Sequence, residues 1–575
     1  MKAGSASLLL ELEASKLGYG AGSATRIEKL LSSVREVQFD DAESLIRFHD
    51  ALLFLRAFPQ SRRVAQLSDG LLAGIVHQVE RLQASGADME LFDNEQFSGI
   101  AGTTISDNFT YDVAHWLVRR YPQQLSVEWD FDEQGRQMAV TLPRFIPLLG
   151  DDSLVEADTP FLDWMANAAG GKGKILAWLL QRVADTPLPS LERTSLYDSL
   201  AVNVFWRLGN SAASRTRARR SVSRMFYHRQ PLLRRNQVSL ADEVSSAPLP
   251  VCKLSRRQGE EVLDLTRTVL TVRYRELYGT TRGDPKYVFQ ADAGRGVQIL
   301  LWGLPPERRL PLRAYHAGLT LKNGVPINYI EGISLFNWME VGFNTFYAFR
   351  DGETAWIYSK VLHFLHQLTG VTCFSVYPYQ LGHENEEAIK SGAFWFYRKL
   401  GFRPVRPELL AITRKEEVKM ARDPTHRTSL RTLRQLAAEH VFYEFGDGLT
   451  GLWDTFSTRK IGLAVQRQMA ERFDGDPERM QQATRKKLSQ DLKVDVGTWS
   501  PLEQSAFENF AAFLSLAPEL TQWTNRQKQA LVDVIRAKVS ADETVYLHLL
   551  QQHPALKEIV LRLGSERPAV KAARV

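Results

Sequence analysis

The sequence predicts a mixed α/β domain held between two mainly helical regions. Apolar residues recur at helical spacing over most of residues 1–250 and again beyond residue 415, whereas strand-like runs with an Asn-Gly turn occupy the stretch between them. The chain has 575 residues, of which 44% are hydrophobic and 24% charged, which is typical of a packed protein of several domains. The expected domains are therefore 1–250, 251–415 and 416–575.

The first region is expected to consist mainly of amphipathic helices. Leu45, Phe48 and Leu52, for example, recur at the spacing of one helix face. Residues 126–149 alternate briefly between apolar and polar, which predicts a short hairpin or an irregular connection. A segment rich in Ser, Ala and Pro over 239–250 predicts the first domain boundary.

A segment at 215–235 carries eight arginines and no acidic residue. The formal net charge of the chain is +6, and without these arginines it is −2, so the basic character is local. Arginines bind RNA phosphates, and Phe226 and Tyr227 could stack on bases, so RNA or another acidic partner is one interpretation. The alternatives are a solvated loop or helix face, or a strip that binds acidic residues between domains.

The middle region begins with a helix. Ser255 and Gln258 have the spacing of a capping box, which predicts a helix start. Asn323-Gly324 is a strong signal for a two-residue hairpin turn. Four strands are expected around this turn, over 297–304, 314–321, 325–335 and 340–349.

The second half of this region alternates between helix and strand. A helix is expected around Tyr358 and Leu362, followed by a strand over 371–377 and a helix over about 386–400. Helix, antiparallel strands, helix, strand and helix in this order predict a mixed α/β domain. Beyond residue 415 the capping-box spacings at 500–503 and 524–527 predict a return to packed helices.

Composition excludes several classes of protein. Cys252 and Cys373 are too few for a disulfide framework or a cysteine zinc site, which favours a reducing compartment. We find no apolar run long enough to span a bilayer and no secretory leader, so a cytoplasmic location without membrane contact is expected. No metal site is predicted.

One segment resembles a known family. Four residues match, in type and spacing, the last conserved helix of the GNAT superfamily of acyl-CoA N-acyltransferases: Ala393, Tyr397, Gly401 and Phe402. At the position where the family has asparagine, this chain has Lys390. The order of predicted elements over about 253–415 is also similar to that family. The resemblance implies a GNAT-like fold for this domain and transfer of an acyl group from a thioester donor, acetyl-CoA or another acyl-CoA, to an amine that the sequence does not identify.

The resemblance also implies roles for individual residues. The donor's pantetheine arm would enter between the strands at 340–349 and 371–377, and Tyr397 would protonate the departing thiolate. Glu340 and Glu331 are the candidate bases, because a carboxylate on a buried strand has a raised pKa. The alternatives are that Tyr397 is an aromatic core residue and that the carboxylates pair with arginines at the rim.

The segment Arg350-Asp-Gly-Glu-Thr-Ala355 stands where the family binds the diphosphate of CoA. Arg350, Gly352, Thr354 and Ala355 are the candidate cofactor-binding residues. Glu353 replaces a glycine of the family pattern, which predicts repulsion of the diphosphate and weak CoA binding. Two further functions therefore remain open: a non-catalytic scaffold or interaction protein with a degenerate cofactor loop, and an RNA-associated or aminoacyl-tRNA-dependent transferase.

Overall fold

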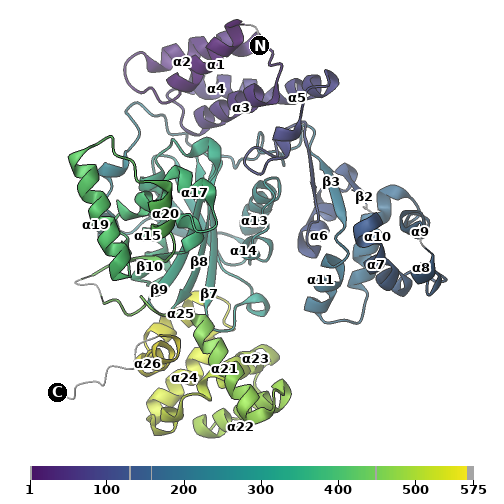
Figure 1. Ribbon diagram of the computed structural model, residues 1–575, viewed down its shortest axis with the longest axis vertical. Helices are drawn as coiled ribbons and strands as arrows, with labels where there is room; N and C mark the ends of the chain where they lie inside the picture. The colour runs from purple at the N-terminus through teal and green to yellow at the C-terminus, as the bar shows by residue number, and fades with distance from the viewer. Residues whose placement is uncertain (1–2, 129–130, 157, 447–449, 566–575) are drawn as a thin grey trace.

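The computed structural model describes residues 3–128, 131–156, 158–446 and 450–565, and it confirms a mixed α/β protein with helices around one large sheet (Figure 1). The nine described strands of this sheet run in the order β11-β12-β10-β9-β8-β7-β6-β5-β4. Only the pair β9 and β10 is parallel within the described sheet. The strands are β4 (Val251–Lys253), β5 (Val288–Gly294), β6 (Val297–Trp302), β7 (Ala314–Lys322), β8 (Val325–Leu335), β9 (Trp338–Thr345), β10 (Cys373–Val376), β11 (Arg403–Pro404) and β12 (Val441–Glu444).

Helices pack on both faces of the large sheet. On one face lie α13 (Arg256–Thr271), which begins with the predicted capping box of Ser255 and Gln258, and α14 (Tyr278–Thr281). On the other face lies α15 (Thr354–Thr369), whose buried Tyr358 packs edge-on against Phe343 of β9. Figure 1 shows these layers with the sheet between them.

The Asn323-Gly324 turn joins β7 and β8, as predicted. Asn323 and Gly324 have φ values of 50° and 80°, the left-handed conformation that a two-residue hairpin turn requires. The turn is also a docking point, because the Asn323 amide donates to the carbonyl oxygens of Ala57, at 2.9 Å, and Phe226, at 3.0 Å. The hairpin tip thus holds the N-terminal helices against the sheet.

The sheet extends beyond the boundary predicted near residue 415. β12 inserts between β10 and β11, so the strand that completes this side of the sheet lies well within the region expected to be helical. The strand has only four residues and follows two helices, α19 (Pro407–Arg422) and α20 (Leu430–Leu436). A run this short gives too little periodicity to be separated from its helical surroundings.

Two expected elements differ in detail. The helix expected over 386–400 is divided into α17 (Glu386–Ser391) and α18 (Ala393–Arg398), because Gly392 adopts a φ of 68° between them. The hairpin or irregular connection expected over 126–149 is a short strand followed by helix α7 (Phe131–Thr141). The alternation covered too few residues to support a second strand.

The N-terminal region contains two units (Figure 1). The first five helices pack at one end of the large sheet: α1 (Ala3–Ser15), α2 (Ser23–Ser33), α3 (Ala42–Ala57), α4 (Arg62–Ala73) and α5 (Ile75–Ala84). The second unit projects from the side and has its own hydrophobic core. It combines a three-stranded sheet, in the order β1-β3-β2, with several helices, so the mainly helical region also holds strands.

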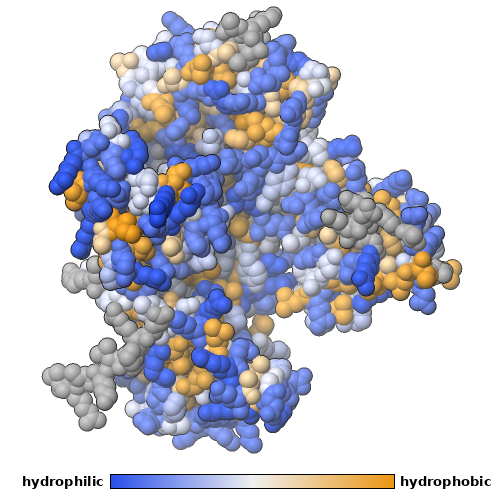
Figure 2. Space-filling view, viewed as in Figure 1, coloured by the Kyte–Doolittle hydropathy of each residue, from blue (hydrophilic) through white to orange (hydrophobic). Residues whose placement is uncertain are grey.

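The elements of this side unit are β1 (Thr104–Asp107), α6 (Tyr111–Arg120), β2 (Leu125–Glu128), α7, α8 (Asp152–Val155), α9 (Phe161–Ala169), α10 (Ile175–Ala184), α11 (Ser190–Asp198) and β3 (Asn203–Arg207). Figure 2 shows apolar residues at its outer end on an otherwise largely hydrophilic face. Leu148 and Val155 of this unit are 89% and 82% exposed.

The arginine segment is an irregular strap between the N-terminal helices and the large sheet. Buried Arg215 pairs with Asp50 of α3 at 2.7 Å, and Arg219 pairs with Asp69 of α4 at 2.8 Å. Arg220 donates to Gln290 of β5 at 2.5 Å. These contacts agree with the interpretation of the segment as a strip that binds acidic residues between domains. Arg215, Arg219 and Arg220 already have partners within the protein, so RNA phosphates would have to compete for them.

After β12, the C-terminal region is helical, from Thr458 to Gly564. Its helices are α21 (Thr458–Phe473), α22 (Pro477–Leu492), α23 (Pro501–Leu514), α24 (Asn525–Ala537), α25 (Glu543–Gln551) and α26 (Pro554–Gly564). The capping boxes predicted at Ser500 and Thr524 begin α23 and α24. In the described part of the chain, we find no helix with the length and apolar character that crossing a bilayer demands.

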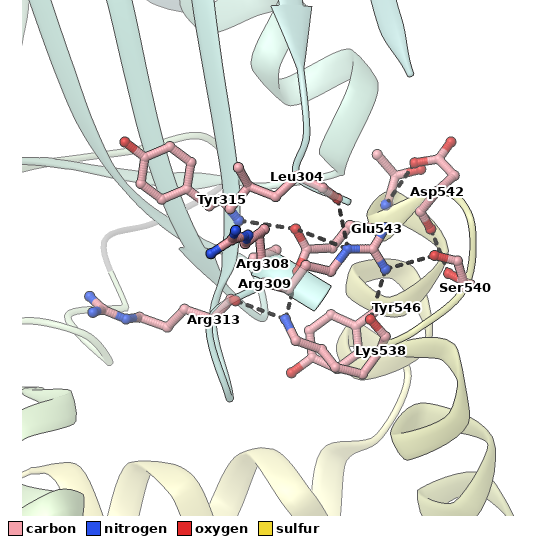
Figure 3. A network of polar contacts seen from close by, with 12 residues as sticks. Leu304, Arg308, Arg309, Arg313, Tyr315, Lys538, Ser540, Asp542, Glu543 and Tyr546 are labelled. Carbon is pink, nitrogen blue, oxygen red and sulfur yellow. Dashed lines mark hydrogen bonds and ion pairs between the residues drawn. The ribbon is translucent and has the colours of Figure 1, made fainter. Parts of the chain in front are cut away.

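A buried charge network fastens this C-terminal region to the sheet (Figure 3). Glu543 lies 2.6 Å from the Lys538 ammonium and 4.0 Å from the Arg309 guanidinium, and all three side chains are at most 4% exposed. The Arg309 guanidinium also donates to the carbonyl oxygens of Lys538 and Ser540, both at 2.7 Å. The backbone N–H of Tyr315 on β7 donates to Glu543 at 3.3 Å. One carboxylate therefore compensates two buried cations.

Candidate functional site

The two parallel strands separate along their length, at the place where the sequence predicts the donor to enter. The pairs that join β9 to β10 are Trp338–Cys373, Met339–Phe374 and Glu340–Ser375. No later pair joins the two strands in the described chain. β9 continues to Thr345, whereas β10 ends at Val376 and turns into α16 (Pro378–Leu381). The backbone of β9 beyond Glu340 therefore faces a gap.

The side chain of Gln380, from α16, occupies this gap. Its Oε1 accepts the backbone N–H of Phe343 at 3.3 Å and the hydroxyl of Tyr397 at 3.1 Å. A Cβ on Gly342 would lie 2.9 Å from the Gln380 amide nitrogen, so a larger residue there would require the Gln380 side chain to shift. Gln380 has no signal in the sequence, because its role depends on where the short helix α16 turns.

Tyr397 lies at the gap, as predicted from its position in the motif. Its ring is 4% exposed and packs edge-on against Tyr358 and Phe402, so the residue is also part of the aromatic core. Burial raises the pKa of the Tyr397 hydroxyl well above its ordinary value. The phenol is therefore neutral at physiological pH and able to donate a proton or a hydrogen bond.

Glu331 lies on the same side of the gap as Gln380. It is directly opposite Gly342 in the pairing of β8 with β9, and its carboxylate accepts a hydrogen bond from the Tyr315 hydroxyl. Burial raises the pKa of Glu331, as expected for a carboxylate on an inner strand. Tyr358 packs against both Phe343 and Tyr397, so Tyr397 lies on the α15 face of the sheet, whereas Glu331 projects from the opposite face.

Glu340 shares this sheet face with Glu331. It is opposite Ile333, two residues further along β8, which makes the two carboxylates diagonal neighbours. Glu340 pairs with His440 at 2.8 Å, and the His440 ring packs edge-on against Tyr377. Sequence reasoning missed His440, because it precedes the unrecognised strand β12. Glu340 is thus paired with a histidine, and not with an arginine as in the alternative interpretation of this carboxylate.

The candidate cofactor-binding residues line a pocket at the N-terminus of α15. The pocket has a volume of about 420 Å³. Its lining includes all four of them, Arg350, Gly352, Thr354 and Ala355, and also Tyr19, Arg234, Arg235, Asp351 and Phe396. Arg350 pairs with Glu387, and Asp351 pairs with Lys16 of the N-terminal region at 3.0 Å. Arginines and a helix N-terminus in one pocket suit an anionic group.

Glu353 does not line this pocket. Its side chain is fully buried, pairs with Arg295 and with Lys322 at 3.5 Å, and accepts the backbone N–H of Leu233 at 3.1 Å. The geometry therefore gives no support to the expected repulsion between Glu353 and a diphosphate. The carboxylate that reaches the pocket is Asp351, and Lys16 offsets its charge.

Behind the pocket, the two buried basic groups Lys322 and His228 have strongly lowered pKa values. Burial lowers the pKa of Lys322 to about 7, and the charge of Arg295 acts in the same direction, while Glu353 opposes it. Burial and the charges of Lys322 and Arg295 lower the pKa of His228 to about 2. Both ring nitrogens of His228 lack a hydrogen-bond partner in the described structure.

Replacing His228 by phenylalanine is expected to make the protein less sensitive to acid. The folded-state pKa of about 2 lies below the ordinary value of 6.5, so the unfolded chain binds the proton more readily. Stability is then fully present above pH 6.5 and falls by about 1.4 kcal/mol for each pH unit below it. His228→Phe should be more stable than the unaltered protein by about 2 kcal/mol at pH 5, relative to their difference at pH 8.

Urea unfolding at pH 5 and pH 8 measures this difference. His77→Phe is the control, because the His77 side chain is 80% exposed and that substitution should leave the acid sensitivity unchanged. An equal loss of stability on acidification in the unaltered protein and His228→Phe would show that His228 is protonated in the folded state.

We find no group of three or more metal-binding side chains in the described residues. The site instead offers a buried phenol, two carboxylates and a basic pocket near the ends of two diverging strands. Comparison with protein-family models, curated proteins and solved structures gave no match to this chain.

Proposed function

We propose that this protein is an N-acyltransferase that moves an acyl group from a thioester donor, such as acetyl-CoA, to an amine. The observation that carries the proposal is the position of the Tyr397 hydroxyl in the gap where β9 and β10 separate. The resemblance of the Ala393 to Phe402 segment to the GNAT superfamily gives the gap its chemical interpretation. The basic pocket at the start of α15 is next to this gap, since the ring of its lining residue Phe396 packs edge-on against the ring of Tyr397.

The residues at the gap provide what acyl transfer requires. Glu340, paired with His440, or Glu331 accepts the proton that the ammonium group must lose before its nitrogen attacks the thioester carbonyl. As the carbon–sulfur bond breaks, the Tyr397 phenol protonates the leaving thiolate. Once Gln380 releases it, the N–H of Phe343 would pair with the pantetheine arm, and Arg234, Arg235 and Arg350 would meet the phosphates.

A second candidate is a non-catalytic scaffold, and one observation favours it. The Gln380 amide already accepts the N–H of Phe343 and the hydroxyl of Tyr397, the groups assigned above to donor and thiolate. An acyltransferase must release this side chain before it binds its donor, whereas a scaffold keeps it in place. The two candidate functions therefore differ in whether a thioester donor displaces the Gln380 side chain. The RNA-dependent alternative gains no support, because several arginines of the strap are already paired.

Replacing Gln380 by alanine is expected to strengthen acetyl-CoA binding. The donor then displaces no hydrogen bond from Phe343, and a hydrogen bond contributes about 1 kcal/mol, equivalent to roughly five-fold in the dissociation constant. Calorimetric titration of acetyl-CoA into both proteins measures this change. Release of free thiol in the presence of a panel of primary amines then tests for transfer itself.

Gln529→Ala is the matched control, because Gln529 lies on α24, in the C-terminal region outside the site, and that substitution should leave binding unchanged. If neither the unaltered protein nor Gln380→Ala binds acetyl-CoA or a longer acyl-CoA, the protein is a scaffold. Binding without thiol release for any amine would likewise contradict the proposed transfer.

A further inference from the structure

A large cleft lies in the side unit, remote in sequence from the gap and unused by the proposed chemistry. It has a volume of about 760 Å³, within the range of ligand-binding pockets. Its floor is one face of the sheet β1-β3-β2, and Asp93 and Tyr274 line it from outside that sheet. The opposite face of the sheet is buried in the core of the unit, through residues such as Ile105, Val204 and Trp206.

The sheet register places an aromatic ring in the centre of this floor. Phe205 lies on the middle strand, directly between Ser106 of β1 and Ser126 of β2. Serine side chains are too short to cover the ring from either side, and Phe205 is only partly buried. An aromatic ring is thus exposed to a polar cleft, where a cation or an apolar group placed over its face would be favourable.

The charges around the ring are mainly negative. Asp93, Asp107 and Glu128 line the cleft together with one cation, Arg207. None of the three carboxylates has an ion-pair partner among the described residues. Burial raises the pKa of Tyr274, and the charges of Asp93 and Asp107 raise it further, which places these carboxylates around the phenol. A ligand that carries positive charge beside a flat or apolar stem would satisfy both the ring and the carboxylates.

We propose that this cleft is a docking site for a basic peptide segment of a partner protein, with an arginine guanidinium over Phe205. Arginine fits better than a compact ammonium, because its planar group stacks on an aromatic ring while it donates to carboxylates at its edge. The cleft, with its volume of about 760 Å³, can take a short segment of an extended chain. The proposal is independent of acyl transfer, since none of its residues belongs to the gap or to the pocket at α15.

A labelled peptide, Gly-Ser-Arg-Arg-Ser-Gly, tests the proposal by fluorescence anisotropy with the full chain. The same peptide with citrulline in place of both arginines keeps the shape and removes the charge. We expect saturable binding of the arginine peptide that weakens with salt, and binding of the citrulline peptide at least about ten-fold weaker. Equal binding of both peptides, or no binding of the arginine peptide at low salt, would overturn the proposal.

Three variants locate the binding. Asp107→Asn with Glu128→Gln should weaken the arginine peptide about ten-fold, and Phe205→Ala about two- to thirty-fold. Arg207→Gln should strengthen it, because a like charge is removed. The control, Glu260→Gln with Glu261→Gln on the exposed side of α13, removes the same charge elsewhere and should change little. Thermal unfolding shows whether each variant is folded. If Phe205→Ala does not fold, the variant with both carboxylates replaced tests the proposal.

Free spermidine distinguishes a peptide from a small amine. We expect spermidine to compete only at concentrations well above those of the peptide. Competition at equal or lower concentrations would assign the cleft to a small polyamine and overturn the peptide proposal, as would unchanged peptide binding by the carboxylate variant.

Discussion

Replacing Glu543 by glutamine is expected to lower the free energy of unfolding by about 3–5 kcal/mol. Glu543 is the carboxylate that the Lys538 ammonium and the Arg309 guanidinium share in the interface between the C-terminal helices and the sheet (Figure 3). Glutamine leaves two buried cations without their counter-ion, and the cost of holding a charge away from water is no longer offset. Burial already lowers the pKa of Lys538, and this substitution should lower it further.

Urea unfolding followed by tryptophan fluorescence measures this loss, because Trp453, Trp499 and Trp523 lie in the C-terminal region. Glu260→Gln is the control: Glu260 forms an exposed pair with Arg256 on α13, and its removal should cost less than about 1 kcal/mol. Glu543→Gln with Lys538→Met removes one charge of each sign and should recover part of the loss. Equal stability of Glu543→Gln and the unaltered protein would mean that water reaches the network.

The sequence predicted those parts of the fold that depend on neighbouring residues. The Asn323-Gly324 turn and the capping boxes at Ser255, Ser500 and Thr524 are local patterns, and the structure confirms each of them. These features need no knowledge of which distant segment packs where.

The missed features depend on long-range packing. β12 has four residues, and it is stabilised by its neighbours β10 and β11 more than by its own pattern. Gln380 and His440 acquire their positions from a short helix and from that strand. Tyr397 was found through the motif that resembles the GNAT superfamily, and Glu331 and Glu340 were found through residue type and strand position. Their partners Gln380 and His440 could not be found in the same way, since a side chain that acquires its position from long-range packing has no sequence signal of its own.

Glu353, in the candidate cofactor loop, is a further residue whose contacts depend on long-range packing and could not be predicted from the sequence. From the sequence, a carboxylate in place of a glycine predicts repulsion of phosphate, and Glu353→Gly would then strengthen CoA binding. In the structure the carboxylate faces inward, towards Lys322 and Arg295. What its replacement does therefore depends on the buried cations, which lie on other segments of the chain.

Glu353→Gly is now expected to destabilise the protein by about 3 kcal/mol or more and to leave acetyl-CoA binding no tighter. Lys322 is fully buried and loses its counter-ion, and the N–H of Leu233 loses its acceptor, which costs a further 1–3 kcal/mol if it stays buried. Urea unfolding measures the first expectation, and calorimetric titration of acetyl-CoA measures the second.

Paired substitutions separate charge from shape at this position. Glu353→Gln keeps an acceptor for Leu233 but removes the charge, so it should be destabilising because of Lys322. Lys322→Met in the same chain removes the uncompensated cation, and the double variant should be more stable than Glu353→Gln. If Glu353→Gly instead binds acetyl-CoA more tightly at unchanged stability, the carboxylate faces the pocket in solution and the repulsion predicted from the sequence is correct.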